Sequence, residues 1–243
     1  AYIIKCDDFV KDESGNIMFL MESAELLTYD KTKNEFSSEA NFIPLKKDWL
    51  VTGLAQQPGT QKYWIGLHSG AFAIYNRATG NLSYAGHNVE KETAVDSLQL
   101  KQGMIHFHFD KRGRFWGVSW ITGHYPNIIR YDEREKGRKI QSYEILTKLR
   151  SYHEISSIVE DKSGRIWLHG NMVLSYFDEV ANEFQLVPSD SKSGQGIVYD
   201  FASALFQDKE QNMWVATGNH GLYRFNPNHQ YFTTVSHFNQ ITK

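Results

Sequence analysis

The chain has a single cysteine, Cys6, among its 243 residues, so an internal disulfide is excluded. No apolar run approaches the ~20 residues that a membrane-spanning helix needs. There is no signal peptide and no initiator Met, and we expect the chain to be a piece of a longer protein. The net charge is only −2, so neither nucleic acid nor an anionic membrane is predicted as a partner of this segment.

Several catalytic signatures are also missing. The sequence has no Gly-x-Ser-x-Gly nucleophile elbow and no glycine pattern of the Walker or dinucleotide-binding kind. Its Asp and Glu residues lie mostly in predicted turns, where no glycosidase pair can be identified and the full ligand series of a calcium loop is absent. The sequence therefore predicts no catalytic residue, no bound metal and no cofactor.

What the sequence does contain is a repeat, best seen at Asp208–Phe225. Two short apolar and aromatic runs flank a Gly-rich link there, as in an antiparallel hairpin. Four earlier copies carry an apolar anchor at the same place, and the anchors are Met18, Trp64, Trp116, Trp167 and Trp214. The first, third and fourth copies begin with a turn of the form Asp-x-x-Gly, the fifth begins with Asp208-Lys209-Glu210-Gln211-Asn212, and the second begins at Pro58. A repeat of roughly 20–50 residues made only of strands predicts a β-propeller.

Each repeat accounts for four strands. One precedes the Asp turn, two flank the Gly-rich link and one follows a Tyr-Asp or Phe-Asn pair. The predicted fold is therefore all-β, a β-propeller of about five four-stranded antiparallel blades in a single domain, with no substantial helix. A short helical turn is expected only within residues 144–154. The predicted blades cover residues 1–40, 41–86, 87–144, 145–188 and 189–243.

The repeat unit Asp-x-x-Gly-x-Ile-Trp, followed by Gly-Leu, a Phe/Tyr-Asp/Asn pair and a final Phe, resembles the two-component regulator propeller repeat. The resemblance covers nearly the whole chain, with the fifth copy the closest match. It implies a periplasmic sensor region of a bacterial hybrid two-component system, often one associated with polysaccharide use. Propellers of that family are typically seven-bladed, so the resemblance also implies part of a larger propeller. The motif builds the scaffold and says little about the ligand.

The predicted binding face is the one formed by the links between the second and third strands. The insert at residues 117–127 is about four residues longer than the other links, and Trp49, His68 and Ser69 fall on the same face. Aromatic rings, His and Asn suit sugars, because sugar rings stack on aromatic faces and sugar hydroxyls form hydrogen bonds. The predicted ligand-binding residues are Trp120, His124, Tyr125, His169, Asn171, Asn219 and His220. The alternative is that these residues only form turns, with Trp120 covering a neighbouring blade.

His106 and His108 have the one spacing that suggests a metal. Alternate residues of a strand point the same way, so the two could share a ligand. A metal site usually needs a third or fourth ligand, and the alternative is two histidines hydrogen-bonded to their neighbours.

The function predicted from these features is a non-catalytic, ligand-binding sensor propeller of a bacterial two-component signalling protein, with a carbohydrate as ligand. The alternatives are a propeller lyase or lactonase with a metal-bearing channel, and a protein-interaction scaffold. The expected partners are a small molecule or oligosaccharide, neighbouring domains of a longer chain and a second copy in a homodimer. The expected location is the periplasm, as part of an inner-membrane protein.

Overall fold

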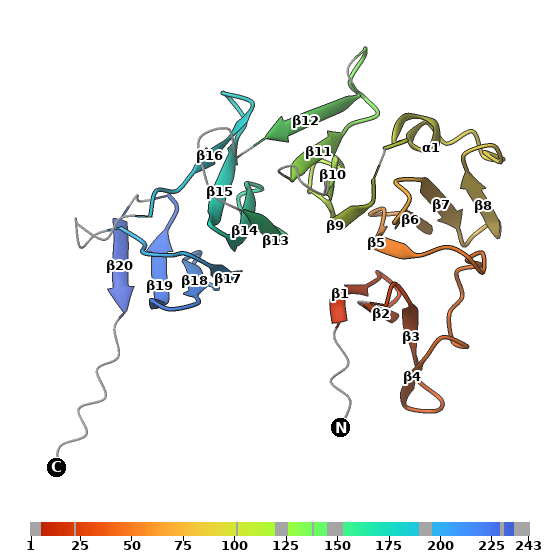
Figure 1. Ribbon diagram of the computed structural model, residues 1–243, viewed down its shortest axis with the longest axis horizontal. Coiled ribbons are helices and arrows are strands. Elements are labelled where there is room, and N and C mark those ends of the chain that lie inside the picture. Colours follow the sequence, from red (N-terminus) through yellow and green to blue (C-terminus); the bar gives the residue numbers. More distant parts are fainter. Residues whose placement is uncertain are drawn as a thin grey trace. The chain divides into compact units, whose positions relative to one another are not determined.

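The computed structural model describes residues 6–21, 23–100, 102–119, 126–137, 139–144, 153–189, 196–228 and 231–235. The chain falls into two compact units, Ala1–Ser142 and Tyr143–Lys243, and each unit is considered by itself. Strands joined by turns and links make up most of both (Figure 1).

The strands of the described residues form five four-stranded antiparallel sheets, which confirms the predicted all-β propeller fold with five blades. In every sheet the strands lie side by side in chain order. The first sheet contains β1 (Cys6–Lys11), β2 (Ile17–Met21), β3 (Leu26–Asp30) and β4 (Glu35–Ser37). The second contains β5 (Val51–Gln56), β6 (Lys62–Leu67), β7 (Phe72–Asn76) and β8 (Asn81–Tyr84). The third contains β9 (Met104–Phe109), β10 (Phe115–Ser119), β11 (Asn127–Tyr131) and β12 (Ile140–Glu144).

The two remaining sheets belong to the second unit. One contains β13 (Glu154–Glu160), β14 (Ile166–Asn171), β15 (Val173–Asp178) and β16 (Glu183–Leu186). The other contains β17 (Ala202–Gln207), β18 (Met213–Thr217), β19 (Gly221–Asn226) and β20 (Tyr231–Val235).

The link between β8 and β9 contains a short helix, α1 (Thr93–Ser97), which the sequence analysis did not predict. Ala94, Val95 and Leu98 are buried, and the side chain of Asn88 accepts the backbone N–H of Glu92 at 2.8 Å. The charged residues of this link outnumber these three apolar positions, so its composition resembles that of a solvated loop. The helical turn expected within residues 144–154 falls on residues 145–152, outside the described residues.

The Asp-x-x-Gly turns are held by the carboxylate that begins them. Oδ1 of Asp161 accepts the backbone N–H groups of Ser163 (2.8 Å) and Arg165 (3.0 Å), and Oδ2 accepts Nε1 of Trp167 at 3.0 Å. The aspartate therefore caps the turn, as predicted, and also orients the indole six residues later. The same carboxylate-to-indole bond joins Asp110 to Trp116 (2.9 Å) and Asp208 to Trp214 (2.8 Å).

The first two repeats lack this bond from a turn aspartate to an anchor tryptophan and form other hydrogen bonds in its place. Met18 has no donor, and Oδ2 of Asp12 instead accepts the hydroxyl of Tyr63 in the next sheet at 2.6 Å. In the second repeat Nε1 of Trp64 donates to Oε1 of Gln57 at 3.2 Å. Gln57, and not Pro58, therefore takes the place of the aspartate, with one extra residue in the turn.

A backbone-to-side-chain bond also joins neighbouring sheets beside these turns. The N–H that follows the turn aspartate donates to a glutamine at the end of the next sheet's first strand, from Glu13 to Gln56 (2.7 Å) and from Lys162 to Gln207 (2.6 Å). Pro58 occupies the donor position of the second repeat and has no N–H. The matching acceptor position in the third sheet holds Phe109 instead of a glutamine.

The buried carboxylate of Asp161 makes the stability of the fold depend on pH. Burial by itself raises the pKa of Asp161, but hydrogen bonds from Ser163, Trp167 and Arg165 outweigh it and hold the pKa below its usual value of 3.8. A carboxyl whose pKa is lower in the folded than in the unfolded chain stabilises the fold at pH values above its unfolded pKa. This stabilisation is lost as the pH falls through the pKa of the folded state. We expect Asp161→Asn to have a lower free energy of unfolding than wild type at pH 7. We also expect that free energy to decrease less than in wild type as the pH is lowered from about 5 to about 2. Urea denaturation across that range measures this, and equal slopes for both proteins would contradict it.

Trp64 lies in the packed core between the second and third sheets, and Trp167 lies in the core between the fourth and fifth sheets. Trp64 is 5% exposed and lies 4.8 Å from Phe115 and 4.9 Å from Phe109, ring centre to ring centre. Trp167 is 2% exposed and lies 5.6 Å from Phe225 of the next sheet. The predicted burial is thus confirmed for Trp64 and Trp167, and also for Trp116, which is fully buried.

Trp214 departs from this pattern, because it is only half-buried. The indoles of Trp64 and Trp167 each pack against the sheet that comes next in the sequence. Trp214 lies in the last sheet of the described residues, and its neighbour Phe206 on the same strand pair is 65% exposed.

The first strand of every sheet is interrupted by a β-bulge. The register shifts lie between Cys6 and Asp8, Val51 and Gly53, Ile155 and Ser157, and Ala202 and Ala204, and in the third sheet between Trp116 and Val118 opposite β9. His106 lies at that last shift with a φ of 54°. The regular alternation that would let His106 and His108 share a metal is therefore broken. Among the described residues, no group of three or more His, Cys, Asp or Glu side chains could hold a metal ion.

Candidate functional site

Three of the sequence-predicted ligand residues, Trp120, His124 and Tyr125, lie outside the described residues. The other four all belong to the second unit, His169 and Asn171 on β14 and Asn219 and His220 on the link that follows β18. They therefore share one edge of that unit's two sheets, as the topology predicted.

His169 is buried within this group. Its ring Nδ1 lies 2.9 Å from the carbonyl oxygen of Ala202, in the first strand of the next sheet. Burial lowers the pKa of His169, while the carbonyl contact raises it by less. This neutral, enclosed imidazole joins two sheets, and a ligand on the surface does not reach it directly.

The remaining three residues gather around Asp200. Nδ2 of Asn219 donates to Oδ2 of Asp200 at 2.9 Å, and Asn171 forms an isolated antiparallel bridge with Phe201. The hydrogen bond from Asn219 is the main reason why the pKa of Asp200 is lowered; the exposed His220 adds a smaller attraction. Sequence reasoning identified three members of this cluster and missed Asp200 and Phe201.

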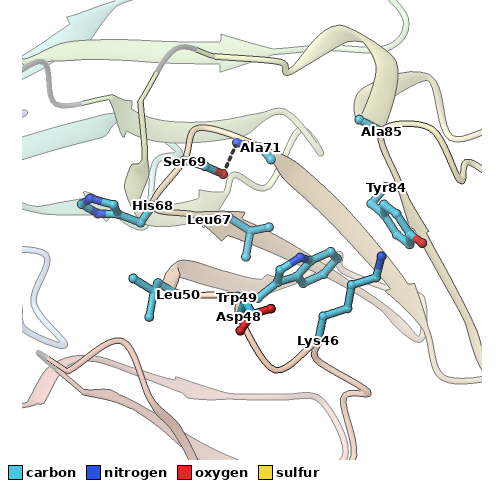
Figure 2. A pocket seen from close by; sticks show the side chains of 10 residues that line it. All are labelled: Lys46, Asp48, Trp49, Leu50, Leu67, His68, Ser69, Ala71, Tyr84 and Ala85. Carbon is cyan, nitrogen blue, oxygen red and sulfur yellow. Dashed lines mark hydrogen bonds between the residues drawn. The ribbon is translucent and has the colours of Figure 1, made fainter.

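A better-formed site lies on the corresponding edge of the first unit. It is a pocket of about 350 Å³ between the link from β4 to β5, the link from β6 to β7 and the end of β8 (Figure 2). Its lining residues are Lys46, Asp48, Trp49, Leu50, Leu67, His68, Ser69, Ala71, Tyr84 and Ala85. The sequence analysis placed Trp49, His68 and Ser69 on this face but did not choose them as the site.

The centre of the pocket is aromatic. The rings of Trp49 and Tyr84 meet edge to face, with centres 5.4 Å apart. Nζ of Lys46 lies 3.7 Å from the centre of the Tyr84 ring and 5.6 Å from that of Trp49. Within the described residues the Lys46 ammonium makes no ion pair, and a cation over an aromatic ring is held by the ring's negative face. Lys46 thus places a positive charge beside an indole that remains half-exposed.

The rim of the pocket is fixed by backbone bonds. The N–H of His68 donates to the carbonyl of Leu50 at 2.9 Å, which ties the β6–β7 link to the link that carries Trp49. Gly70 turns this corner with a φ of +85°, and a Cβ there would lie 2.2 Å from the carbonyl oxygen of Leu100. His68 and Tyr84 lie at opposite ends of the pocket (Figure 2). The arrangement is preformed, which reduces the entropy lost when a ligand binds.

Chemically, the pocket combines an apolar aromatic floor with a cation, a carboxylate, an imidazole and a hydroxyl. That set can stack against a ring and form hydrogen bonds to hydroxyl or anionic groups. The juxtaposition of Lys46, Trp49 and Tyr84 joins the β4–β5 link to the end of β8, about 35 residues further along the chain, and no local pattern in the sequence predicts it. Of the residues that the structure describes, no helix has the length and apolar character to cross a membrane.

No protein-family model matches the chain, and no curated protein sequence matches it either. Among solved structures, it is similar to a chain in the crystal structure of the mitotic checkpoint complex, with a TM-score of 0.55 and 12% identity over 90% of this chain and 59% of that one. It is similar to a protein of unknown function from Bacteroides caccae, with a TM-score of 0.54 and 10% identity over 93% and 79% of the two chains. These likenesses show the fold alone.

A third similar structure is the extracellular domain of a putative hybrid two-component system from B. thetaiotaomicron. The TM-score is 0.46 and the identity is 17%, over 93% of this chain and 34% of that one. The present chain therefore spans about a third of that domain and 59% of the checkpoint-complex chain. A TM-score this low supports no argument about function.

Proposed function

We propose that this chain is a non-catalytic sensor β-propeller of a bacterial two-component signalling protein, located in the periplasm, and that it binds a carbohydrate. The observation that carries the proposal is the pocket of Lys46, Trp49 and Tyr84 in the first unit. Neighbouring domains of a longer chain would receive the signal.

The carbohydrate class follows from the chemistry of the pocket. A sugar ring presents C–H groups on its faces and hydroxyls around its edge. The half-exposed indole of Trp49 suits the face, and Asp48, His68 and Ser69 suit the hydroxyls. The volume of about 350 Å³ lies in the range of small-molecule sites.

The sensor class rests on the repeat. Five copies of a turn followed by an apolar anchor, three of them with the form Asp-x-x-Gly, resemble the two-component regulator propeller repeat. The turn carboxylates cap the turns and orient three of the indoles, so the motif residues are used in the scaffold and leave the link edges for a ligand. The lyase or lactonase alternative depended on His106 and His108, and no observation favours it.

The test is binding of oligosaccharides, first on a glycan array and then by calorimetric titration. We expect Trp49→Ala to weaken binding of the selected sugar by about tenfold or more, which corresponds to about 1.4 kcal/mol per factor of ten. Phe206→Ala is the matched control, because it removes an exposed aromatic ring in the other unit.

The outcomes separate clearly. If no glycan binds the folded protein, the proposed ligand class is wrong. If a glycan binds equally well to wild type and to a folded Trp49→Ala variant, the site lies elsewhere on the link face. The predicted insert then becomes the candidate, and a Trp120→Ala/Tyr125→Ala double variant tests it.

A further inference from the structure

The ammonium group of Lys46, in the pocket of the first unit, lies against aromatic rings. Nζ is 3.7 Å from the centre of the Tyr84 ring and 5.6 Å from that of the Trp49 ring. Among the residues that the structure describes, it forms neither an ion pair nor a hydrogen bond. An ammonium has three N–H donors, and the face of one ring does not satisfy all of them. Lys46 therefore has donors left for a ligand.

Two other lysines use their charge within the fold. Nζ of Lys62 pairs with Oε1 of Glu92 at 2.5 Å. Nζ of Lys162 donates to the backbone carbonyls of Asp208 at 2.8 Å and Lys209 at 3.0 Å. Each of these cations joins two segments of its own unit. The cation of Lys46 instead lines a pocket whose other walls are partly exposed.

The pocket also contains a carboxylate, that of Asp48, but it does not neutralise Lys46. Within the described part of the chain the two side chains form no ion pair. In Figure 2 the Lys46 ammonium lies at the Tyr84 ring, whereas the Asp48 carboxylate points away from it, toward the Leu50 side of the pocket. The positive charge is thus placed at the Tyr84 end, where an anionic group of a ligand would be attracted.

We propose that the ligand of this pocket is an acidic sugar, whose anionic group is bound by Lys46. This inference rests on the proposed carbohydrate binding and narrows its ligand class. A sugar ring stacked on the exposed part of the Trp49 indole carries its substituents at the ring edge, and Lys46 lies beside that indole. A carboxylate or a sulfate ester at the edge would accept charge-assisted hydrogen bonds from the ammonium. Because the rings already hold the lysine side chain, less of its freedom is lost on binding.

The test uses matched pairs of glycans that differ only in charge. Glycans that contain a uronic acid are compared with their carboxyl-reduced forms, and sulfated glycans with their desulfated forms, on an array and then by calorimetric titration. We expect wild type to bind the acidic member of a pair about tenfold more tightly or better. The pair that shows this preference distinguishes a carboxylate from a sulfate ester as the group that is bound.

Variants of Lys46 assign the preference to its charge. Lys46→Gln should bind both members of the pair equally, whereas Lys46→Arg, which keeps the charge, should retain a preference for the acidic member. Raising the NaCl concentration from about 50 to about 300 mM should weaken acidic binding in wild type but not in Lys46→Gln. Lys47→Gln is the matched control, because Lys47 is an exposed neighbour that does not line the pocket. It should keep the wild-type preference.

The results separate this inference from the proposed function. Neutral glycans that bind with an affinity dependent on Trp49, with acidic members binding no better, would support carbohydrate binding and overturn the acidic ligand. A folded Lys46→Gln variant that keeps the full preference for the acidic member would also overturn it. If neither acidic nor neutral glycans bind the folded wild type, both proposals are wrong.

Discussion

Replacing Trp167 with alanine is expected to lower the free energy of unfolding by ~3–5 kcal/mol, the usual cost of deleting a large core aromatic side chain. The indole is 2% exposed, and it lies 5.3 Å from Tyr176 and 5.6 Å from Phe225, ring centre to ring centre. Its loss leaves a void between the two sheets of the second unit and leaves Asp161 with one hydrogen bond fewer.

Trp214→Ala is the matched control. Trp214 makes the same bond to its turn aspartate, at 2.8 Å, but it is only half-buried. We therefore expect a distinctly smaller loss from Trp214→Ala, and the difference between the variants measures packing without the hydrogen bond. Urea denaturation followed by circular dichroism gives both values. Equal losses would show that the carboxylate bond, and not burial between sheets, accounts for the effect.

Gly170→Ala is expected to be the most damaging small substitution in the second unit. A Cβ at this position would lie 1.9 Å from the carbonyl oxygen of Glu154 and 2.8 Å from the backbone nitrogen of Ser156. Both are backbone atoms next to the β-bulge of β13, so no side-chain rotation relieves the contact and the strands must separate. Overpacking typically costs 1–3 kcal/mol and occasionally more, and we expect a loss of about 3 kcal/mol.

Gly218→Ala adds the same methyl group where the nearest atom, in Phe201, is 3.6 Å away. We expect little change in its melting temperature, whereas Gly170→Ala should melt well below wild type. A Gly170→Ala variant that melts with wild type would mean that β13 and β14 are not paired as described.

Most of the architecture could be predicted from the sequence, because the features that define it are local. A polar turn followed by an apolar anchor specifies a hairpin within about ten residues, and five copies, three of them with the form Asp-x-x-Gly, specify five sheets. The anchor was also enough to predict buried tryptophans. Trp214 is less buried than the other three, since burial there depends on the surface that packs against the last sheet, and Trp214 itself carries no information about that surface.

The features that were missed depend on register or on distant parts of the chain. The bulge at His106 shifts the alternation of β9, and nothing in the residues 104–109 distinguishes a bulged strand from a regular one. Gln57 can replace aspartate only because the turn has one extra residue. The pocket of Lys46, Trp49 and Tyr84 requires the β4–β5 link to meet the end of β8, so sequence reasoning could find its face but not its members.

The amide-to-glutamine bonds between neighbouring sheets bear on how such a chain lengthens during evolution. The donor is a backbone N–H, which any residue except proline supplies, and the acceptor is one side chain, Gln56 or Gln207. Each repeat that has both parts carries a donor for its successor and an acceptor for its predecessor. A tandem duplication of such a repeat therefore brings both halves of a new joint with it. A copy like the second repeat, with Pro58 at the donor position, brings only the acceptor and is joined to its successor by other contacts, such as the bond from the hydroxyl of Thr52 to the carbonyl of Met104.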